Sequence, residues 1–315
     1  MIKRENTVIF DDKGIPSIMV KFTKESNKNL FGGSEKPHPM FIIGGTEYDE
    51  VFISKYPNTI INGRPYSLPF MKPATNITND EAAMLCFDKG EGWHMLTAQE
   101  WGYLALDSFR NGTLPHGNTD RGKYHANKKE KGELYDGYRT LTGSGPATWA
   151  HDHTPEGVYD LCGNTWEMVR GLRLMNGDLQ VAENNDAALD IDLGEDSPNW
   201  KPVLAGKEII RISTGDGMSF TTDDVDTEEG WIGSRWGDVK YECEIAEQLR
   251  ELALFAGEPE AYLFADTDGE RFPYRGGGWY AASDAGVFCA DLSYPRAYAS
   301  TGVGFRSAFF RKTEN

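Results

Sequence analysis

Residues 275–306 read RGGGWYAASDAGVFCADLSYPRAYASTGVGFR, and this stretch carries most of the information about the fold. Apolar runs at 285–292 and 303–311 predict two strands, separated by small and polar residues. Between 278 and 302 there is no Lys, Glu, Gln or Met, although 26% of the chain is charged. Tyr, Ser, Asp, Gly and Ala dominate instead, as in antibody paratopes, where Tyr provides contact area at low entropic cost. The stretch therefore predicts a β segment that presents a binding surface.

Two more motifs lie upstream of this stretch. Residues 92–101 read GWHMLTAQEW, and residues 157–168 read GVYDLCGNTWEM. Together with RGGGW at 275–279 and GVGFR at 302–306, they resemble, in the same order, the motifs of formylglycine-generating-enzyme-type domains. The resemblance covers about Met40 to Phe310. It implies an α+β chain with a C-type lectin fold, in the formylglycine-generating-enzyme-like variant with long inserted loops.

The catalytic branch of that superfamily is a copper oxidase with two cysteines shortly after Arg-Gly-Gly. The corresponding positions here are Ala281 and Gly286, so the thiolate pair that would hold soft copper is missing. A related iron-dependent branch uses three histidines, and His151 with His153 would supply at most half of a metal site. We therefore expect no enzymatic activity; an oxidase of this type with altered ligands is the alternative.

The tract at 276–306 also resembles the variable region of proteins diversified by retroelements. In that family, adenines of a template are randomised, often within Asn codons that cannot become Lys, Glu, Gln, Met or Trp. The resemblance implies a receptor-binding protein whose variable positions contact the ligand: Tyr280, Ala281, Ser283, Asp284, Asp291, Ser293, Tyr294, Tyr298, Ser300 and Gly302. A fixed, carbohydrate-binding C-type lectin module is a further alternative.

Other residues of these motifs are expected to form the scaffold. Buried apolar side chains would each contribute ~1.5–3 kcal/mol and let the positions between them vary. Arg306 is expected to bind a buried carboxylate through two hydrogen bonds, and Glu167 is one candidate. The scaffold residues are Trp279, Phe288, Leu292, Phe305, Arg306, Trp166 and Asn164.

The rest of the chain gives local signals. Strands are expected at Thr7–Phe10 and Ser17–Phe22, and Met40–Ile43 with Val51–Tyr56 as a hairpin or paired strands. Helices are expected at Asn79–Lys89, at Thr97–Phe109, where Thr97 and Glu100 form a capping box, and at Val239–Ala256. Residues 112–146 are expected to be a long loop, and 180–237 an acidic, irregular segment with a short strand at 207–213. The expected organisation is an N-terminal strand and turn segment at 1–37 and one domain at 38–315, with an insert at about 181–272.

Composition limits the partners. A net charge of −17 disfavours nucleic acid and anionic membranes. The expected partner is a protein or glycan on a target cell surface, and a homo-oligomer is one option. Acidic segments at 190–196, 216–226 and 266–270 make calcium an optional cofactor, although none matches an EF-hand loop. The first residues lack a signal-peptide core and no apolar stretch is long enough to span a membrane, so we expect synthesis in the cytoplasm. The expected location is a virus particle, as a tail or surface component, or otherwise the cytoplasm where the chain is made without a signal peptide. The four scattered cysteines are expected to be buried free thiols.

Overall fold

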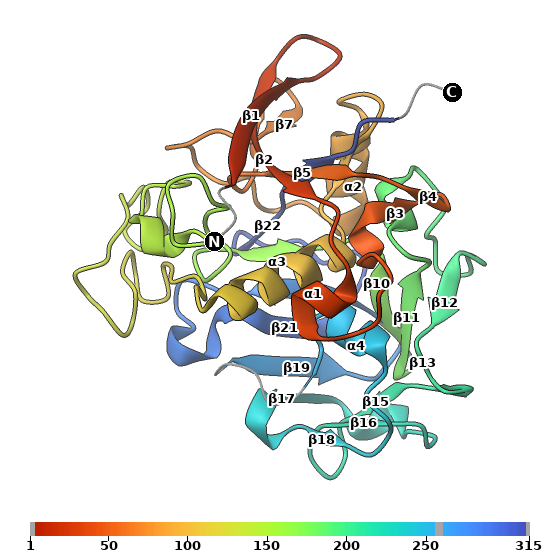
Figure 1. Cartoon of the computed structure of the whole chain (residues 1–315). Coiled ribbons are helices and arrows are strands. Elements are labelled where there is room, and N and C mark those ends of the chain that lie inside the picture. The colour runs from red at the N-terminus through yellow and green to blue at the C-terminus, as the bar shows by residue number, and fades with distance from the viewer. Residues whose placement is uncertain (1–3, 256–260, 313–315) are drawn as a thin grey trace.

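The computed structural model describes residues 4–255 and 261–312. Within them the regular secondary structure is mostly strand with few helices, and most strands belong to a small sheet or to a large curled sheet (Figure 1). Helix α3 (Ala98–Asn111) runs across the middle of the molecule between these sheets. Its side chains share one hydrophobic core with both sheets, because Ile53 of the small sheet and Leu292 of the large one belong to the same buried cluster as Leu104.

The small sheet joins the two ends of the chain. Its order is β1, β2, β5, β23, β8, and all neighbours are antiparallel. Its strands are β1 (Glu5–Phe10), β2 (Pro16–Thr23), β5 (Glu50–Ser54), β8 (Trp93–Met95) and β23 (Ser307–Phe309). The two strands expected near the N-terminus are confirmed. β1 pairs with β2, and β2 pairs with β5, so residues 1–37 contribute to the same sheet as the C-terminal strand β23.

The large sheet has the order β17, β19, β21, β20, β10, β11, β15, β16, β18; in addition, β12 pairs with β11, β9 with β20, and β22 with β9. Its strands are β9 (Trp166–Met168), β10 (Leu172–Met175), β11 (Asp178–Ala182), β12 (Trp200–Pro202), β15 (Arg211–Ser213), β16 (Ser219–Thr221), β17 (Trp231–Arg235), β18 (Lys240–Tyr241), β19 (Tyr262–Asp266), β20 (Glu270–Gly276), β21 (Gly286–Tyr294) and β22 (Val303–Gly304). Residues 181–272, expected as an insert, therefore supply strands to the sheet that contains the 276–306 tract.

Short hairpins and single turns of helix complete the chain. The hairpins are β3 (Ile42–Ile43) with β4 (Thr46–Glu47), β6 (Thr59–Ile61) with β7 (Arg64–Tyr66), and β13 (Leu204–Ala205) with β14 (Glu208–Ile209). The 3-10 turns are Pro39–Phe41, Ala147–Trp149, Asp186–Ala188, Thr227–Glu229, Trp236–Asp238 and Ala282–Asp284. The expected pairing of 40–43 with 51–56 is wrong. Gly44 and Gly45 both have positive φ, which turns β3 back onto β4, while β5 pairs elsewhere.

The α-helices are α1 (Asn27–Phe31), α2 (Asn79–Phe87), α3 and α4 (Glu247–Glu251). The capping box of Thr97 and Glu100 is confirmed: the Thr97 hydroxyl accepts from the Glu100 amide at 3.2 Å, and the Glu100 carboxylate accepts from the Thr97 amide at 2.9 Å. Helix α2 is also confirmed, but its N-cap is Thr78, one residue before the expected start. Residues 112–146 form the expected loop.

The structure corrects three further expectations. The expected helix Val239–Ala256 shrinks to α4, because Lys240–Tyr241 pairs with β16 and the Tyr241 ring stacks on Phe220 at 5.0 Å; Ala256 itself lies outside the described residues. The segment 180–237 is irregular only in part: residues 183–199 have no strand, but β12 to β17 follow, and the short strand expected at 207–213 is present as β14 and β15. The run at 303–311 is split into β22 and β23, since Phe305 and Arg306 between them turn inward and are buried.

Candidate functional site

The candidate site is built around β21, which lies between β19 and β20. Two buried indoles hold this strand: Trp101 Nε1 of α3 donates to the Val287 carbonyl at 2.8 Å, and Trp236 Nε1 donates to the Phe288 carbonyl at 2.9 Å. Phe288 and Leu292 are buried in the central core. The strand is therefore fixed by contacts to both α3 and the 3-10 turn at Trp236–Asp238.

Arg306 fixes the other end of the tract. The expected pair with Glu167 is present: Arg306 Nε donates to Glu167 Oε2 at 2.6 Å, and Nη2 also contacts Oε1. The guanidinium donates further to the carbonyls of Ser54 at 3.1 Å and Tyr159 at 3.0 Å, and both charged side chains are buried. Burial raises the pKa of Glu167, while the positive charge of Arg306 opposes that rise. Phe305, the neighbouring scaffold candidate, is fully buried beside Met168.

Asn164 connects the tract to the loop at 112–146. It is buried and has a left-handed backbone with φ of 63°. Its side-chain Oδ1 accepts from the Thr140 amide at 2.8 Å, its Nδ2 donates to the Thr140 carbonyl at 3.0 Å, and its own carbonyl accepts from the Trp279 amide at 3.1 Å. These contacts give Asn164 a structural position under the tract.

The two tryptophans expected in the scaffold are only half-buried. The Trp279 ring packs on Tyr138, with ring centroids 4.4 Å apart, and the Arg121 guanidinium lies 5.5 Å from its centroid. Trp166 Nε1 donates to the Tyr280 hydroxyl at 3.4 Å. Trp166 therefore borders the surface that the tract presents.

Most of the expected variable positions reach the surface. Tyr280 is 60% exposed. Partial exposure is shared by Ala281, Ser283, Asp284, Ser293, Tyr294, Tyr298, Ser300 and Gly302. Asp291 differs, since it is only 6% exposed. Its position in the middle of β21, between β19 and β20, explains this burial.

Three tyrosines form a cluster at the end of β21. Tyr294 stacks on Tyr274 with centroids 5.1 Å apart and lies 4.2 Å from Tyr298. Tyr274, which precedes the tract, is 1% exposed, and its buried ring packs against the rings of the other two tyrosines. Burial raises the pKa of Tyr294, so its hydroxyl remains protonated at neutral pH.

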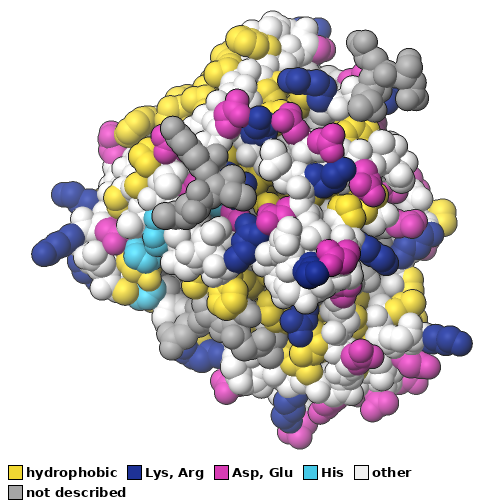
Figure 2. Space-filling model, in the orientation of Figure 1, with side chains coloured by type: hydrophobic (Ala, Val, Ile, Leu, Met, Phe, Trp, Pro, Cys, Tyr) yellow, Lys and Arg dark blue, Asp and Glu magenta, His cyan; other side chains and the backbone are white. Residues whose placement is uncertain are grey.

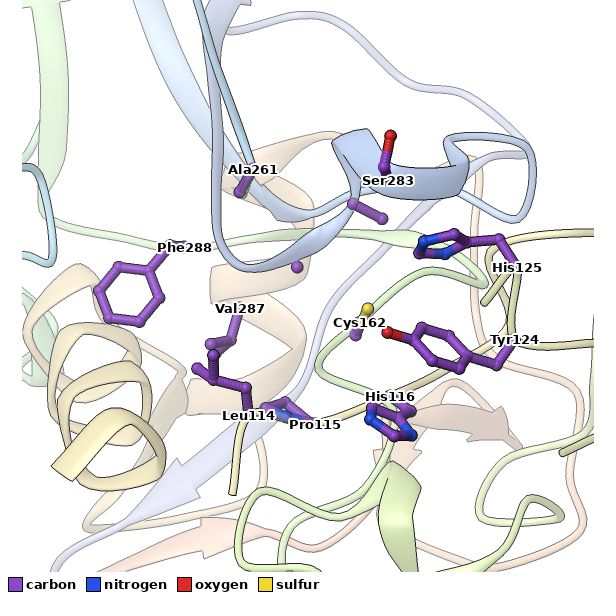
Figure 3. A pocket seen from close by; sticks show the side chains of 12 residues that line it. Leu114, Pro115, His116, Tyr124, His125, Cys162, Ala261, Ser283, Val287 and Phe288 are labelled. Carbon is purple, nitrogen blue, oxygen red and sulfur yellow. The ribbon is translucent and has the colours of Figure 1, made fainter. Parts of the chain in front are cut away.

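A cavity of about 290 Å³ opens beside the tract (Figure 3). Its wall includes His116, Tyr124, His125, Cys162 and Ser283. The His116 ring stacks on Tyr124 at 4.1 Å and its Nδ1 lies 2.9 Å from Glu130 Oε2. Burial raises the pKa of Cys162 to about 12, which keeps this thiol protonated and unreactive. Gly286 lines the same cavity.

In the segment 266–270, one of the three considered for calcium, the acidic residues are bound to arginine instead. Arg271 contacts Asp266 at 3.0 Å, and Glu270 is shared by Arg173 at 2.6 Å and Arg296 at 2.8 Å. In residues 4–255 and 261–312, no three His, Cys, Asp or Glu side chains are grouped to hold a metal ion. The space-filling view shows acidic and basic side chains interspersed over one face of the molecule (Figure 2).

The histidines and cysteines have different surroundings. His151 and His153 do not share a site, because His151 Nδ1 accepts from the Val158 amide at 2.9 Å while His153 Nε2 bonds the Leu114 carbonyl at 2.9 Å. All four cysteines are free thiols, as expected, and all except the half-buried Cys243 are buried. Across the described part of the chain, no helix has the length and apolar character needed to cross a membrane.

Sequence reasoning missed the aromatic residues beside the tract on β17 and β19. Trp231 is 61% exposed, and Phe264 stacks between it and Tyr262. The alternation of Tyr262, Leu263, Phe264 and Ala265 is the period-two signal that could have identified this strand and its outer face.

Comparisons with known proteins give distant similarities in shape. No model of a protein family matches the sequence, and no curated protein matches it. The structural neighbours include PvdO from Pseudomonas aeruginosa, at 16% identity over 98% of this chain and 99% of that one, with a TM-score of 0.37. They also include variable protein 1 of Treponema denticola, at 12% identity over 96% of this chain and 98% of that one, with a TM-score of 0.37.

Proposed function

We propose that this chain is a non-catalytic, ligand-binding protein with a C-type-lectin-type fold, and that residues 276–306 form a diversified binding surface. One observation carries the proposal. The residues expected to stay constant in β21 and at Phe305 and Arg306 are buried, while the expected variable positions, Asp291 excepted, have access to solvent.

The chemistry of the exposed positions supports binding. Tyrosine provides a large, rigid contact area with two rotatable bonds, and serine and glycine provide adaptable hydrogen bonding. Tyr280, Tyr294 and Tyr298 bring three such rings to one side of the tract. Tyrosines in such positions are frequent hot spots of protein interfaces. The proposed partner is a protein or glycan on a target cell, and the proposed setting is a receptor-binding component of a virus particle.

Sequencing this locus in sibling isolates tests the proposal. We expect variation to concentrate at the exposed tract positions, with Trp279, Phe288, Leu292 and Phe305 unchanged. A near-copy of the segment encoding 276–306, next to a reverse transcriptase gene, is expected in the same genome. A tract that varies no more than the rest of the chain, without such a copy, would leave a fixed binding module instead.

A further inference from the structure

A row of paired residues connects the tract to strands outside it. Phe264 of β19 pairs with Gly233 of β17 on one side and with Asp291 of β21 on the other. Asp291 also pairs with Tyr274 of β20, and Tyr274 pairs in turn with Met168 of β9. Directly paired residues point their side chains to the same face of a sheet. Phe264 therefore shares a face with Asp291 although it lies outside residues 276–306.

Trp231, Phe264 and Tyr262 form an aromatic wall on this face. The Trp231 and Phe264 rings lie 5.8 Å apart with planes 12° from parallel, and the Phe264 and Tyr262 rings lie 5.4 Å apart at 21°. Gly233 leaves room for the central ring, because a Cβ at this position would come within 2.5 Å of Phe264. The guanidinium of Arg235 lies 5.2 Å from the Tyr262 centroid, so one end of the wall already stacks against a cation.

Trp166 joins the aromatic wall to the tract. Its ring meets Phe264 edge to face, with centroids 6.3 Å apart and planes at 74°. Its indole nitrogen bonds the hydroxyl of Tyr280, which is 60% exposed. The exposed aromatic surface therefore continues from β17 to the first loop of the tract.

Asp291 provides a negative charge among these rings. One carboxylate oxygen accepts from the Ser293 amide at 3.1 Å and from the Ser293 hydroxyl. Among the described residues, no Lys or Arg forms an ion pair with Asp291, and both of its hydrogen bonds, from Ser293, reach the same oxygen, Oδ1. Within the described part of the chain, this carboxylate therefore has one oxygen without a hydrogen-bond donor and lies between aromatic rings with no cation beside it. A buried charge requires such a partner, and here it is missing.

We infer that the aromatic wall and Asp291 recognise the guanidinium of an arginine presented by a polypeptide partner. A guanidinium is planar, so it stacks on aromatic faces and also binds a carboxylate through its edge. The net charge of −17 favours the same kind of partner at longer range. The inference rests on the proposed function and assigns separate roles to two parts of the surface. The aromatic wall lies outside the tract and stays constant when the tract varies. Asp291 lies within the tract and sets the charge preference of this variant.

A titration with a nona-arginine peptide tests this inference. The full chain carries ¹⁵N-labelled tryptophan, and its indole signals are followed at physiological salt. The signals of Trp231 and Trp166 should shift, while those of the buried Trp101 and Trp236 should not. Asp291→Asn should weaken binding about tenfold, and Trp231→Ala about threefold or more. Nona-lysine, which carries the same charge but cannot stack as a plane, should bind more weakly.

Asp224→Asn is the matched control, because it changes the net charge equally and its side chain is 99% exposed. If it weakens binding as much as Asp291→Asn, the attraction is general and the inference is overturned. Melting temperatures close to that of the native chain verify that the variants fold.

Further outcomes separate the inference from the proposed function. If Tyr280→Ala abolishes peptide binding while Trp231→Ala and Phe264→Ala leave it unchanged, the tract binds but the wall does not. If none of the indoles shifts with the peptide, the arginine site is overturned, and variation at the locus alone decides the proposed function. A neutral glycan that shifts the same indoles equally in Asp291→Asn would replace arginine as the ligand.

Discussion

Replacing Arg306 with Met tests the buried pair that holds the end of the tract. The substitution keeps a long apolar side chain but removes the bonds to Glu167 at 2.6 Å and to the carbonyls of Ser54 and Tyr159. A buried carboxylate and two buried carbonyls then lose their donor. Breaking such a pair costs roughly 3–5 kcal/mol, which is a large part of the ~5–15 kcal/mol that stabilises a typical domain.

The loss should depend on pH. Burial raises the pKa of Glu167 even in the presence of Arg306, and removing the positive charge should raise it further. The pKa of this carboxyl is higher in the folded chain than its value of 4.5 in the unfolded chain. Its ionisation therefore lowers the free energy of unfolding at high pH, and this loss disappears as the pH falls and the group becomes protonated. The destabilisation in Arg306→Met should therefore be greatest above the raised pKa and shrink as the pH falls towards 4.5.

Urea unfolding at pH 7.5 and pH 5.5 measures both effects. The double variant Arg306→Met with Glu167→Gln should recover ~1–2 kcal/mol, since it removes the unpaired charge. Arg311→Met, at an exposed position, serves as the control and should stay within about 0.5 kcal/mol of the native chain. A loss below about 1 kcal/mol for Arg306→Met, or strictly additive effects in the double variant, would refute the structural role given to the pair.

Three other predictions concern the scaffold. Lys89 is buried and donates to Ser17 Oγ at 3.0 Å, and burial lowers its pKa to about 7. Between pH 7 and 10.5 the unfolded chain therefore binds one more proton than the folded chain, so the free energy of unfolding should rise with pH across this range. Lys89→Met should remove that rise in urea titrations. Equal pH slopes in both proteins would contradict this. Gly163→Ala should lower stability by more than ~2 kcal/mol in thermal melts, because its φ is +71° and the new Cβ would lie 2.1 Å from the Asn118 carbonyl oxygen. The control Gly206→Ala, with φ of +63° and open space around it, should show only the ~1–2 kcal/mol backbone cost; similar losses in both would count against the close contact. Phe288→Ala should cost ~3–5 kcal/mol by urea unfolding and Tyr280→Ala less than about 0.5 kcal/mol, and comparable losses would mean that the tract is not divided into core and surface.

Local signals predicted the features that depend on a few neighbouring residues. The capping box at Thr97 and Glu100 fixes the start of α3 because both partners lie within one helical turn. The Arg306–Glu167 pair was predictable in kind because a buried guanidinium requires a carboxylate, and Glu167 was one candidate for it. In both examples, side-chain chemistry leaves few alternatives.

Features that depend on distant partners were not predictable. Lys240–Tyr241 becomes a strand because β16 offers it a parallel edge and Phe220 a ring to stack on, and these partners lie about twenty residues upstream. The acidic composition of 180–237 suggested an irregular segment, yet cross-strand pairing made it part of the large sheet. The aromatic wall escaped notice for the same reason, since alternation in 262–265 reveals a strand but not the tract beside it.

The burial of β21 on both faces limits where the tract can vary. From Val287 to Leu292 every residue is buried, so substitutions within the strand affect close-packed surroundings. The expected variable positions with access to solvent instead lie in 280–284 and 293–302, on either side of the strand, where single changes cost little stability. Asp291 is the exception, and its burial raises its pKa to about 6. A larger residue there would displace Phe264 or Tyr274, so position 291 should accept only small side chains. Exchanging Asp291 for a small neutral residue should therefore change the charge of this position without reshaping the fold.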